Sequence, residues 1–418
     1  MGIIKIGITI VLFWLYSVFT FSQSQRAGII SDIHYLSEKL TDKGVATQEY
    51  VAATGRNIID IPQILDSVLN EYVKRQIDLL LIPGDLTKDG EKQSHTDLAE
   101  KFRNLTDKGI KVFVIPGNHD INMSNAVTFT GAKALPADNI SPEGFKEIYS
   151  HCGYSAAFEH DSLTLSYAAE ISPVLWLLAI DSNLYREYTN HSISGGKIPP
   201  STEQWILKIL SQAKENKAKV IAMMHHGLVE HFPYQSMVMP QYLVDDWQRL
   251  RSLFADNGVK VIFTGHSHAN DISEFVSSNG NKIYDIETGA LCSFPFPYRY
   301  AEISDSKISI STKNMESIRT NPDLQEEGKI TLKNAAKKII RSKVGNRLKG
   351  LPPDAMDLIT SVAAEIFILH VKGDEVVDNN LKRQIEQIAK EMDFPADTSP
   401  EYLQLDFPPT DNNLIIEL

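Results

Sequence analysis

The chain has 418 residues, of which 43% are hydrophobic and 22% are charged, and its formal net charge is -12 at pH 7. This composition is typical of a globular protein with room for one large domain, or for a large domain and a small one. No block of Lys or Arg stands out, which argues against a protein that binds nucleic-acid polymers through their phosphates.

The first 22 residues are predicted to form a secretory signal peptide. Lys5 precedes an almost unbroken apolar run over residues 6–21, and the small residues Thr20 and Ser22 place a cleavage site after Ser22. A retained membrane anchor is the alternative, but the run is short for a span of about 20 residues. No later segment is apolar enough to cross a bilayer. We therefore expect an exported protein, either periplasmic or secreted.

Strands and helices are predicted to alternate over much of the chain. Six short apolar runs rich in Val, Ile and Leu are typical of strands buried on both faces. They cover residues 27–30, 77–82, 110–115, 174–180, 219–224 and 259–263. Helical patterns cover residues 61–76, 94–108 and 201–216, with Ser94 as an N-cap and Ser201 with Gln204 as a capping box. This alternation predicts a layered α/β fold.

The pattern changes after the last of these strands. Residues 282–288 and 301–312 are expected to be strands of an antiparallel closing sheet. Three helical patterns follow over residues 332–348, 354–369 and 381–392, and the Pro-rich tail from Phe394 is expected to be irregular. We therefore predict a main domain over residues 26–316 and a small C-terminal helical domain over residues 321–418. The helical domain would cover the main domain or form a homodimer contact.

Five short polar clusters each follow a predicted strand. In chain order they are Asp32-Ile33-His34, Gly84-Asp85, Gly117-Asn118-His119-Asp120, His225-His226 and Gly265-His266-Ser267-His268. Ligands of an open α/β sheet bind in the crevice outside the carboxyl ends of the strands, so these clusters are expected to converge. Each cluster alone is a common pattern. Together they hold six of the twelve His of the chain, which makes a coincidence of structural accidents improbable.

The residue types in these clusters suit metal ions. Asp32 and His34 stand two residues apart and could grasp one ion, and His266 and His268 repeat this spacing. Carboxylate, amide oxygen and imidazole together suit borderline transition metals such as Mn, Fe, Zn or Co, rather than an all-oxygen Ca or Mg cage. Seven such side chains are too many for one ion. We therefore expect two divalent or trivalent transition-metal ions (Mn, Fe or Zn) that share a bridging carboxylate.

In this order, the motifs D-x-H, G-D, G-N-H-D, H-H and G-H-x-H resemble those of the calcineurin-like metallophosphoesterase superfamily, over roughly residues 26–312. The resemblance implies a four-layer αββα sandwich, with two mixed sheets between outer helices. Residues 31–35, 84–87, 90–91, 94–95 and 116–122, together with the helical end, most resemble secreted class III cyclic-nucleotide phosphodiesterases that carry a C-terminal helical domain.

The resemblance also implies a role for each motif residue. One metal would be bound by Asp32, His34, Asp85 and His268, and the other by Asp85, Asn118, His225 and His266. His119 would be the catalytic residue that faces the leaving group, and Asp120 would orient it. In similar enzymes the first His of the H-H pair is the ligand, which leaves His226 outside the metal shell. The pair continues as Gly227-Leu228 here, where many relatives have two prolines.

Such a site is expected to hydrolyse phosphoesters, with a bridging hydroxide made available by the two ions and a proton given to the leaving oxygen by His119. The leading prediction is a phosphodiesterase acting on cyclic nucleotides or similar diesters. A phosphomonoesterase, such as a nucleotidase or a protein phosphatase, is the alternative. A monoester dianion needs added positive donors, and no Arg lies in the clusters. A non-catalytic binding module is less favoured because no motif residue is missing.

Five further residues are expected to lie outside the chemistry or at its edge. Cys152 and Cys292 are interpreted as packing residues or one optional disulfide. His95 follows a predicted helix start and is expected to be structural. His231 could face the pocket. Asp181 ends a predicted strand and is expected to support the site or to cap a turn.

Overall fold

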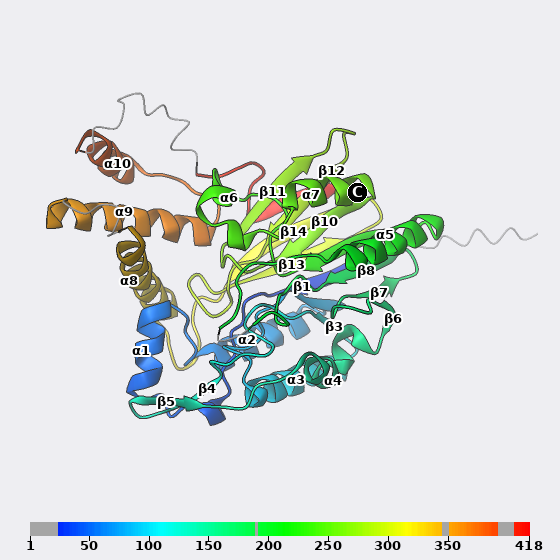
Figure 1. Ribbon diagram of the computed structural model, residues 1–418, viewed down its shortest axis with the longest axis horizontal. Helices are drawn as coiled ribbons and strands as arrows, with labels where there is room; N and C mark the ends of the chain where they lie inside the picture. The colour runs from blue at the N-terminus through cyan, green and yellow to red at the C-terminus, as the bar shows by residue number, and fades with distance from the viewer. Residues whose placement is uncertain (1–23, 189–190, 345–350, 392–404) are drawn as a thin grey trace, which may run out of the picture.

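The computed structural model describes residues 24–188, 191–344, 351–391 and 405–418 of the protein. The predicted signal peptide, residues 1–22, lies outside these residues. Two β-sheets pack face to face, and helices cover the outer face of each sheet (Figure 1). This arrangement is a four-layer αββα sandwich, which confirms the predicted fold class.

The first sheet has six strands in the order β15-β14-β13-β1-β2-β3. They are β1 (Gln25–Ile29), β2 (Leu79–Ile82), β3 (Lys111–Val114), β13 (Pro297–Ile303), β14 (Lys307–Asn314) and β15 (Asn413–Glu417). The second sheet has seven strands in the order β11-β12-β10-β9-β8-β7-β6. They are β6 (Ala157–His160), β7 (Tyr167–Ser172), β8 (Leu175–Ile180), β9 (Lys219–Met224), β10 (Val259–Thr264), β11 (Asp271–Val276) and β12 (Lys282–Glu287). Both sheets mix parallel and antiparallel pairs.

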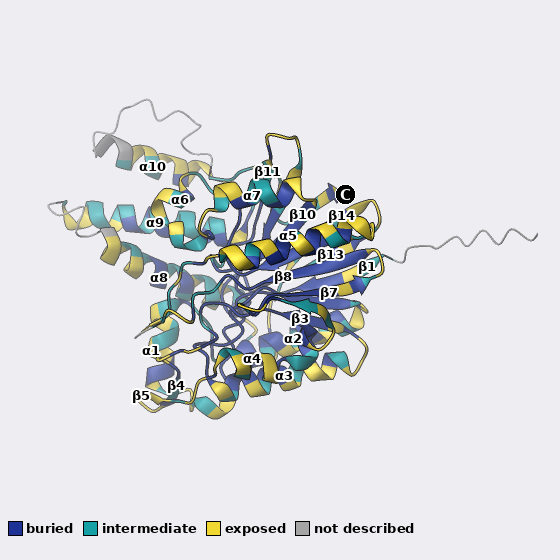
Figure 2. Ribbon diagram, turned by 45° about the vertical axis from the view of Figure 1, so that its right-hand side comes forward, coloured by how far each residue is buried: buried dark blue, intermediate teal, exposed yellow. Residues whose placement is uncertain are grey.

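Four amphipathic helices make the outer layers. The six-stranded sheet is covered by α2 (Ile61–Lys74) and α3 (Lys92–Thr106), and the seven-stranded sheet by α5 (Pro200–Glu215) and α7 (Trp247–Asp256). In Figure 2 the strands are mostly buried, whereas the helices are exposed on their outer faces. Smaller elements at the edge of the sandwich are α1 (Val45–Thr54), β4 (Val127–Thr130), β5 (Lys133–Pro136) and α4 (Pro142–Ile148).

The six predicted strands are present as β1, β2, β3, β8, β9 and β10. All residues of β8 are buried, as predicted for a strand that is covered on both faces. Consecutive side chains of a strand point to opposite faces. Leu177 accordingly packs in the core between the sheets, and Leu178 packs in the core formed with α5 and α7.

Two predicted helix starts are wrong. Helix α3 begins at Lys92, so Ser94 lies inside its first turn, where its hydroxyl accepts a hydrogen bond from the N–H of Ser37. Helix α5 begins at Pro200 and has Pro199 as its N-cap, so the predicted capping box is absent. Proline fits the first turn of a helix because its ring fixes a helical φ and it lacks the N–H that would be unpaired there.

The predicted closing sheet is also wrong. Strand β12 lies in the seven-stranded sheet and runs parallel to β10. The run 301–312 is not one strand, because Ser304, Asp305 and Ser306 form the turn of the β13–β14 hairpin. The turn is held by the N–H of Ser304, which donates to the carbonyl of Lys307 over 2.9 Å. Three consecutive polar residues, which interrupt the alternation of apolar and polar residues, are the signal that separates the two strands.

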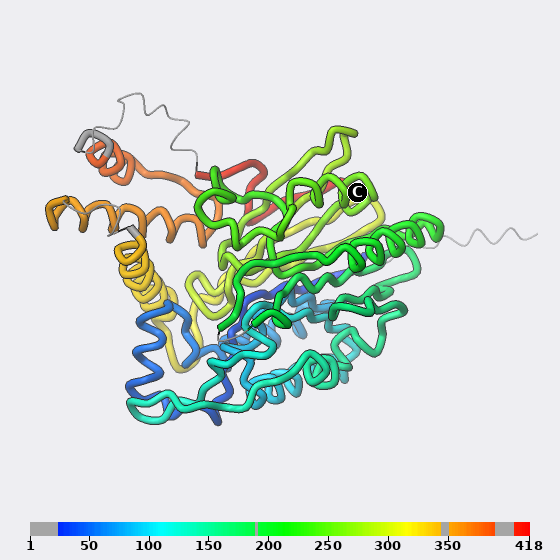
Figure 3. The backbone as a smooth tube through the Cα atoms, in the orientation of Figure 1, coloured from blue at the N-terminus to red at the C-terminus, as the bar shows by residue number. Residues whose placement is uncertain are grey.

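The C-terminal extension contains the predicted helices, as α8 (Leu324–Val344), α9 (Pro353–Lys372) and α10 (Asn379–Glu391). Helix α8 lies beside α1 (Figure 3). The tail is not irregular throughout, because β15 pairs antiparallel with β14 at the edge of the six-stranded sheet and buries Ile416. β-branched residues suit a strand, and the open edge of β14 provides its partner. The expected irregular stretch that overlaps residues 392–404 lies outside the described residues, and the division into two domains stays a prediction.

None of the helices in the described parts of the chain is both long enough and apolar enough to cross a membrane.

Leu177→Ala is expected to destabilise the protein strongly, because it leaves a cavity between the two sheets where the side chain is completely buried. The free energy of unfolding should fall by about 2–5 kcal/mol in urea denaturation. Val276→Ala, at the exposed end of β11, is the control and should change it by less than about 0.5 kcal/mol. Equal losses in both variants would contradict the assigned core.

Candidate active site

The predicted metal ligands converge at one end of the two sheets. Two groups of side chains have ligand atoms within 4.8 Å of one another, and each could hold a metal ion. The first group is Asp32, His34, Asp85 and His268, and the second is Asp85, His225 and His266. These residues follow the carboxyl ends of β1, β2, β9 and β10. Motifs that lie far apart in the sequence therefore meet in one buried site.

Strained backbone holds five of these side chains. The residues Asp32, His34, Asp85, His266 and His268 all have φ between 43° and 78°, in the left-handed region. For a residue other than glycine this conformation costs about 1–3 kcal/mol, and it persists only where the surrounding structure enforces it. The strain turns the chain sharply at the strand ends, so the side chains point into one space.

Asp85 lies between the two groups. Its Oδ2 is 3.4 Å from His34 Nε2, and its Oδ1 is 3.6 Å from His225 Nε2. Burial, and then the negative charges of Asp32 and Asp120, raise the pKa of Asp85 well above its ordinary value. Asp85 therefore faces both groups, so one carboxylate could be a ligand for two ions.

Asp32 and His268 complete the first group. Asp32 Oδ2 accepts hydrogen bonds from Ser31 Oγ (2.6 Å) and from the N–H of His266 (3.0 Å). Its Oδ1 is buried and has no hydrogen-bond partner among the described residues. His268 Nε2 lies 3.3 Å from that oxygen and 3.2 Å from His34 Nε2. Two imidazoles and a carboxylate that meet at one point fit a transition-metal ion.

Hydrogen bonds determine which nitrogens of the second group are free. His225 Nδ1 donates to the carbonyl of Pro83 (2.9 Å), which leaves Nε2 unprotonated at 3.1 Å from Asn118 Oδ1. His266 Nε2 donates to the carbonyl of Ser194 (2.8 Å), which leaves its Nδ1 unprotonated. Such partners fix the tautomer of a metal-binding His. Burial lowers the pKa of His225 to about 4, so the ring stays in the neutral form that binds metals.

His226 is engaged by other partners. Its Nδ1 lies 2.8 Å from Ser182 Oγ, and its Nε2 lies 3.1 Å from the carbonyl of Ser194. Both ring nitrogens are therefore used in binding the segment that follows β8. This geometry favours His225 over His226 as a metal ligand.

His119 lies beside the first group, with its ring centre 5.0 Å from that of His34. Its Nδ1 is 2.7 Å from Asp89 Oδ1, and Asp89 in turn pairs with Lys88 Nζ. Burial alone would raise the pKa of Asp89, but the hydrogen bond from His119 and the charge of Lys88 lower it to about 2. The ionised Asp89 therefore holds His119 in one orientation and leaves its Nε2 for proton transfer.

The prediction that Asp120 orients His119 is wrong. The carboxylate of Asp120 is buried and accepts hydrogen bonds from the backbone N–H groups of Gly117 (2.8 Å), Leu86 (3.0 Å) and Thr87 (2.9 Å). These bonds join the loop after β3 to the loop after β2, and both loops carry metal-ligand candidates. Asp120 therefore shapes the backbone beneath the site, and Asp89 takes the orienting role.

Two residues outside the five sequence clusters belong to the site. One is Asp89, whose only sequence signal is its position four residues after Asp85. The other is Arg56, in the loop between α1 and α2, whose Nη1 donates to Tyr50 Oη over 3.4 Å. Burial, and then the nearby positive charge of Arg56, lower the pKa of both His34 and His119. A guanidinium in this place could bind the anionic oxygens of a ligand.

The remaining candidates have structural roles. Asp181 caps its own turn by accepting hydrogen bonds from Asn183 and Tyr185, and it also accepts the N–H of Leu165 from the segment before β7. His95 is buried between a tyrosine hydroxyl and a backbone carbonyl, which confirms the structural expectation. His231 does not face the site and lies in a separate acidic cluster. Cys152 and Cys292 are buried and free, so the optional disulfide is absent.

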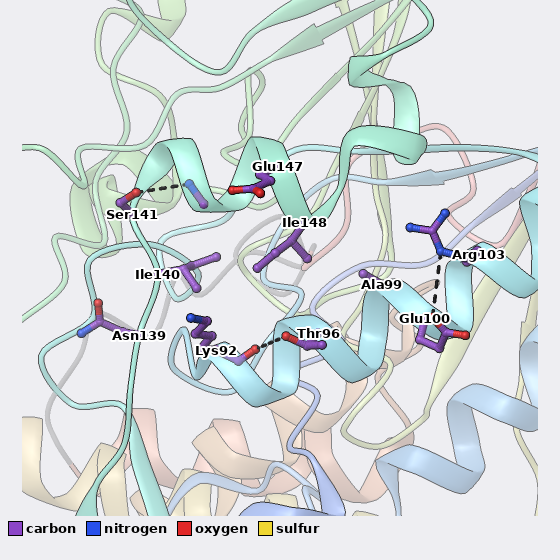
Figure 4. Close-up of a pocket in the computed structure, with 11 residues that line it drawn as sticks. Lys92, Thr96, Ala99, Glu100, Arg103, Asn139, Ile140, Ser141, Glu147 and Ile148 are labelled. Carbon is purple, nitrogen blue, oxygen red and sulfur yellow. Dashed lines mark hydrogen bonds and ion pairs between the residues drawn. The ribbon is translucent and has the colours of Figure 1, made fainter.

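A separate hollow of about 590 Å³ lies between α3 and α4 (Figure 4). Its walls carry Lys92, Thr96 and Arg103 on one side and Ser141 and Glu147 on the other. Thr96 and Ser141 already make hydrogen bonds within their own helices. No predicted metal ligand is among the residues that line this hollow.

A family model described as Calcineurin-like phosphoesterase matches residues 26–270, which is more than half of the chain. All seven predicted metal ligands, and His119, lie within this span.

Two curated relatives match shorter stretches. A probable cyclic nucleotide phosphodiesterase of Pseudoalteromonas sp. (strain SM9913) is 32% identical over 138 residues, which is 32% of this chain and 46% of the relative. A 3',5'-cyclic-nucleotide phosphodiesterase of Nostoc sp. is 33% identical over 92 residues, which is 22% of this chain and 29% of the relative. The chain therefore spans less than half of the length of either relative.

Solved structures resemble the chain at low sequence identity. A dimetal phosphatase from Danio rerio has a TM-score of 0.47 and 13% identity, and the match covers 69% of this chain and 96% of that chain. A purple acid phosphatase from yellow lupin (Lupinus luteus) has a TM-score of 0.38 and 12% identity, with 70% and 52% covered.

Asp85→Asn should cost the protein both metal ions, because it removes the charged oxygens that face both groups. Elemental analysis of the purified protein measures the loss. The metal-free variant should fold, because the neutral amide has the size of the carboxylate and relieves repulsion from Asp32. Asp305→Asn, an exposed turn residue, is the control and should keep both ions. Unchanged metal content in Asp85→Asn would refute the bridging position.

Proposed function

Because the chain belongs to the calcineurin-like phosphoesterase family, we propose that it is a two-metal phosphodiesterase that hydrolyses cyclic nucleotides or similar diesters. The observation that carries this proposal is the position of Asp85 between two groups of metal-ligand side chains, with His119 beside them. The cyclic-nucleotide substrate is supported by the names of the two curated relatives. The predicted signal peptide adds the proposal that the reaction takes place outside the cytoplasm.

We assign a set of ligands to each ion. The first set is Asp32, His34, Asp85 and His268, and the second is Asp85, Asn118, His225 and His266. The buried, unpartnered oxygen of Asp32 and the mixture of imidazole, amide and carboxylate fit Mn, Fe or Zn. When bound, such a pair supplies Lewis-acid stabilisation of the phosphoryl charge and a water of lowered pKa.

His119 is proposed as the group that gives a proton to the leaving oxygen. An alkoxide is a poor leaving group, and a positioned acid accelerates its departure by about 100-fold to 10,000-fold. Asp89 accepts the Nδ1 proton of His119, so the proton on Nε2 of the imidazolium is the one that can be transferred. Arg56 is proposed to attract the anionic phosphoryl oxygens, since its charge acts on His34 and His119.

A phosphomonoesterase is the second candidate function, and Arg56 is the observation that favours it. The five sequence clusters contain no Arg, which speaks for a diester, but the charge of Arg56 acts on Asp85 and His119. A monoester carries more negative charge than a diester and gains more from an added positive group.

His119→Ala should reduce turnover of an alkyl phosphodiester by about 100-fold or more and leave the metal content unchanged. Asp89→Asn should reduce it less, by about 10-fold to 100-fold, because it removes only the group that orients His119. Both losses should be smaller for bis-(p-nitrophenyl) phosphate, whose leaving group needs little help from an acid.

His160→Ala is the matched control for both variants, because this His lies on the edge strand β6, away from the site. Its turnover should equal that of the unchanged protein. Full activity of His119→Ala on the alkyl diester would exclude the proposed proton donor.

A substrate comparison decides between the two candidate functions. The metal-loaded protein is assayed with mono- and bis-(p-nitrophenyl) phosphate and with 3',5'-cyclic nucleotides, and kcat/KM should be higher for the diesters. Arg56→Ala should lower kcat/KM for the monoester by more than for the diesters, because the dianion depends more on the guanidinium. A preference of the unchanged protein for the monoester would overturn the diesterase proposal.

A further inference from the structure

A second cluster of ligand-type side chains lies where the C-terminal extension meets the seven-stranded sheet. Asp271 begins β11, His370 and Glu375 lie at and after the end of α9, and Asp406 and Asp411 belong to the tail before β15. Ligand atoms of Asp271, His370 and Glu375 lie within 4.8 Å of one another, and so do those of Asp271, Asp406 and Asp411. We call these five residues the seam cluster.

Unpartnered oxygens distinguish the seam cluster from an ordinary hydrogen-bonded network. Asp271 is 0% exposed, and its Oδ1 is 2.7 Å from His231 Nδ1. Its Oδ2 has no hydrogen-bond partner among the described residues. Glu375 Oε2 and Asp406 Oδ1 are also buried and have no hydrogen-bond partner among these residues. Leaving a buried carboxylate oxygen unpaired is costly. These three oxygens belong to two groups that share Asp271, which points to a ligand at their junction.

Positive groups lie near the seam cluster. Burial disfavours the charged forms of His231 and His370, but the neighbouring carboxylates raise the pKa of both. The guanidinium of Arg299 donates to the carbonyl of Asp411 (2.6 Å). His370 Nδ1 is 2.7 Å from Glu375 Oε1 and 4.0 Å from Asp271 Oδ2. No Lys or Arg among the described residues forms an ion pair with the cluster. Burial, and then the neighbouring carboxylates, raise the pKa of Asp406 to about 7 and that of Asp411 to about 8. A cation would remove the repulsion that causes these shifts.

We propose that the carboxylates of Asp271, Glu375, Asp406 and Asp411 bind Ca²⁺, a hard divalent cation, at a third site. A set of several carboxylates is the ligand type that Ca²⁺ prefers. The imidazole-rich groups at the strand ends suit transition metals instead. The two kinds of site share no ligand, so each can be occupied without the other.

The bound ion would hold the extension against the catalytic sheet, since its ligands come from β11, from the end of α9 and from the tail. Polar contacts also lead from the seam cluster to the active site. Asp271 bonds to His231, whose Nε2 lies 3.3 Å from Glu287 Oε2. Glu287 accepts the N–H of Ser267 (3.1 Å), the residue between two of the assigned ligands.

Titration of the full chain with Ca²⁺ tests this site, after the two-metal centre has been loaded with Mn²⁺. Ca²⁺ at about 100 times its Kd should raise the Tm by roughly 5 °C, and elemental analysis should find one Ca²⁺ per chain. Asp406→Asn combined with Glu375→Gln should lose both effects and keep the Mn²⁺. This variant should fold without Ca²⁺, because it removes two repelling charges. Glu316→Gln combined with Glu326→Gln, at two exposed positions, is the charge-matched control.

Asp85→Asn separates this proposal from the proposed function. That variant should lose the transition metals and keep the Ca²⁺ response, whether or not the protein hydrolyses diesters. The third site is overturned if Ca²⁺ leaves the Tm of the unchanged protein where it was. It is also overturned if Ca²⁺ raises the Tm of the double variant as much as that of the unchanged protein. The seam carboxylates would then share protons or water and bind no ion.

Discussion

Buried negative charge at the strand ends is the constraint to which the active site is adapted. Asp32 and Asp85 are fully or almost fully buried, and in the described parts of the chain their ion-pair partners are imidazoles. Space around them is minimal. A Cβ at Gly117 would lie 2.1 Å from Asp85 Oδ1, and one at Gly265 would lie 2.4 Å from Asp32 Oδ2, so only glycine fits. Such crowding of carboxylates becomes favourable when cations lie between them. The left-handed backbone at these turns directs the same side chains toward one space.

Polar groups beneath the loops keep the site in place without facing a ligand. Asp120 accepts hydrogen bonds from three backbone N–H groups of the two loops and so satisfies these buried donors. Lys88 is a buried cation that lies 4.8 Å from the centre of the Tyr50 ring, pairs with Asp89 and has Glu91 at 3.4 Å. A charge with this many partners tolerates burial, and it holds the carboxylate that orients the proposed proton donor.

The C-terminal extension contacts the sandwich on two sides of the site. On one side, α8 packs on the end of α1, where a Cβ at Gly55 would lie 2.6 Å from Leu332 Cδ1. Gly55 has a φ of +76° and directly precedes Arg56, so this contact fixes the start of the loop that brings the guanidinium to the site. On the other side, the tail and the end of α9 surround Asp271 at the start of β11. The extension can therefore affect both the charge and the position of groups near the metal ligands.

The layered fold and the metal-ligand candidates could be predicted from the sequence, because both depend on local patterns. Apolar runs of strand length and strand-end motifs are visible without any knowledge of which strands pair. The folded chain was needed to show that β15 joins the sheet edge, since that strand pairs with a partner about one hundred residues away. It was also needed to show that Asp89, and not Asp120, contacts His119, and that Arg56 approaches the site. Two carboxylates in neighbouring loops look alike in sequence, and the distance between their oxygens and an imidazole exists only after the loops have packed together.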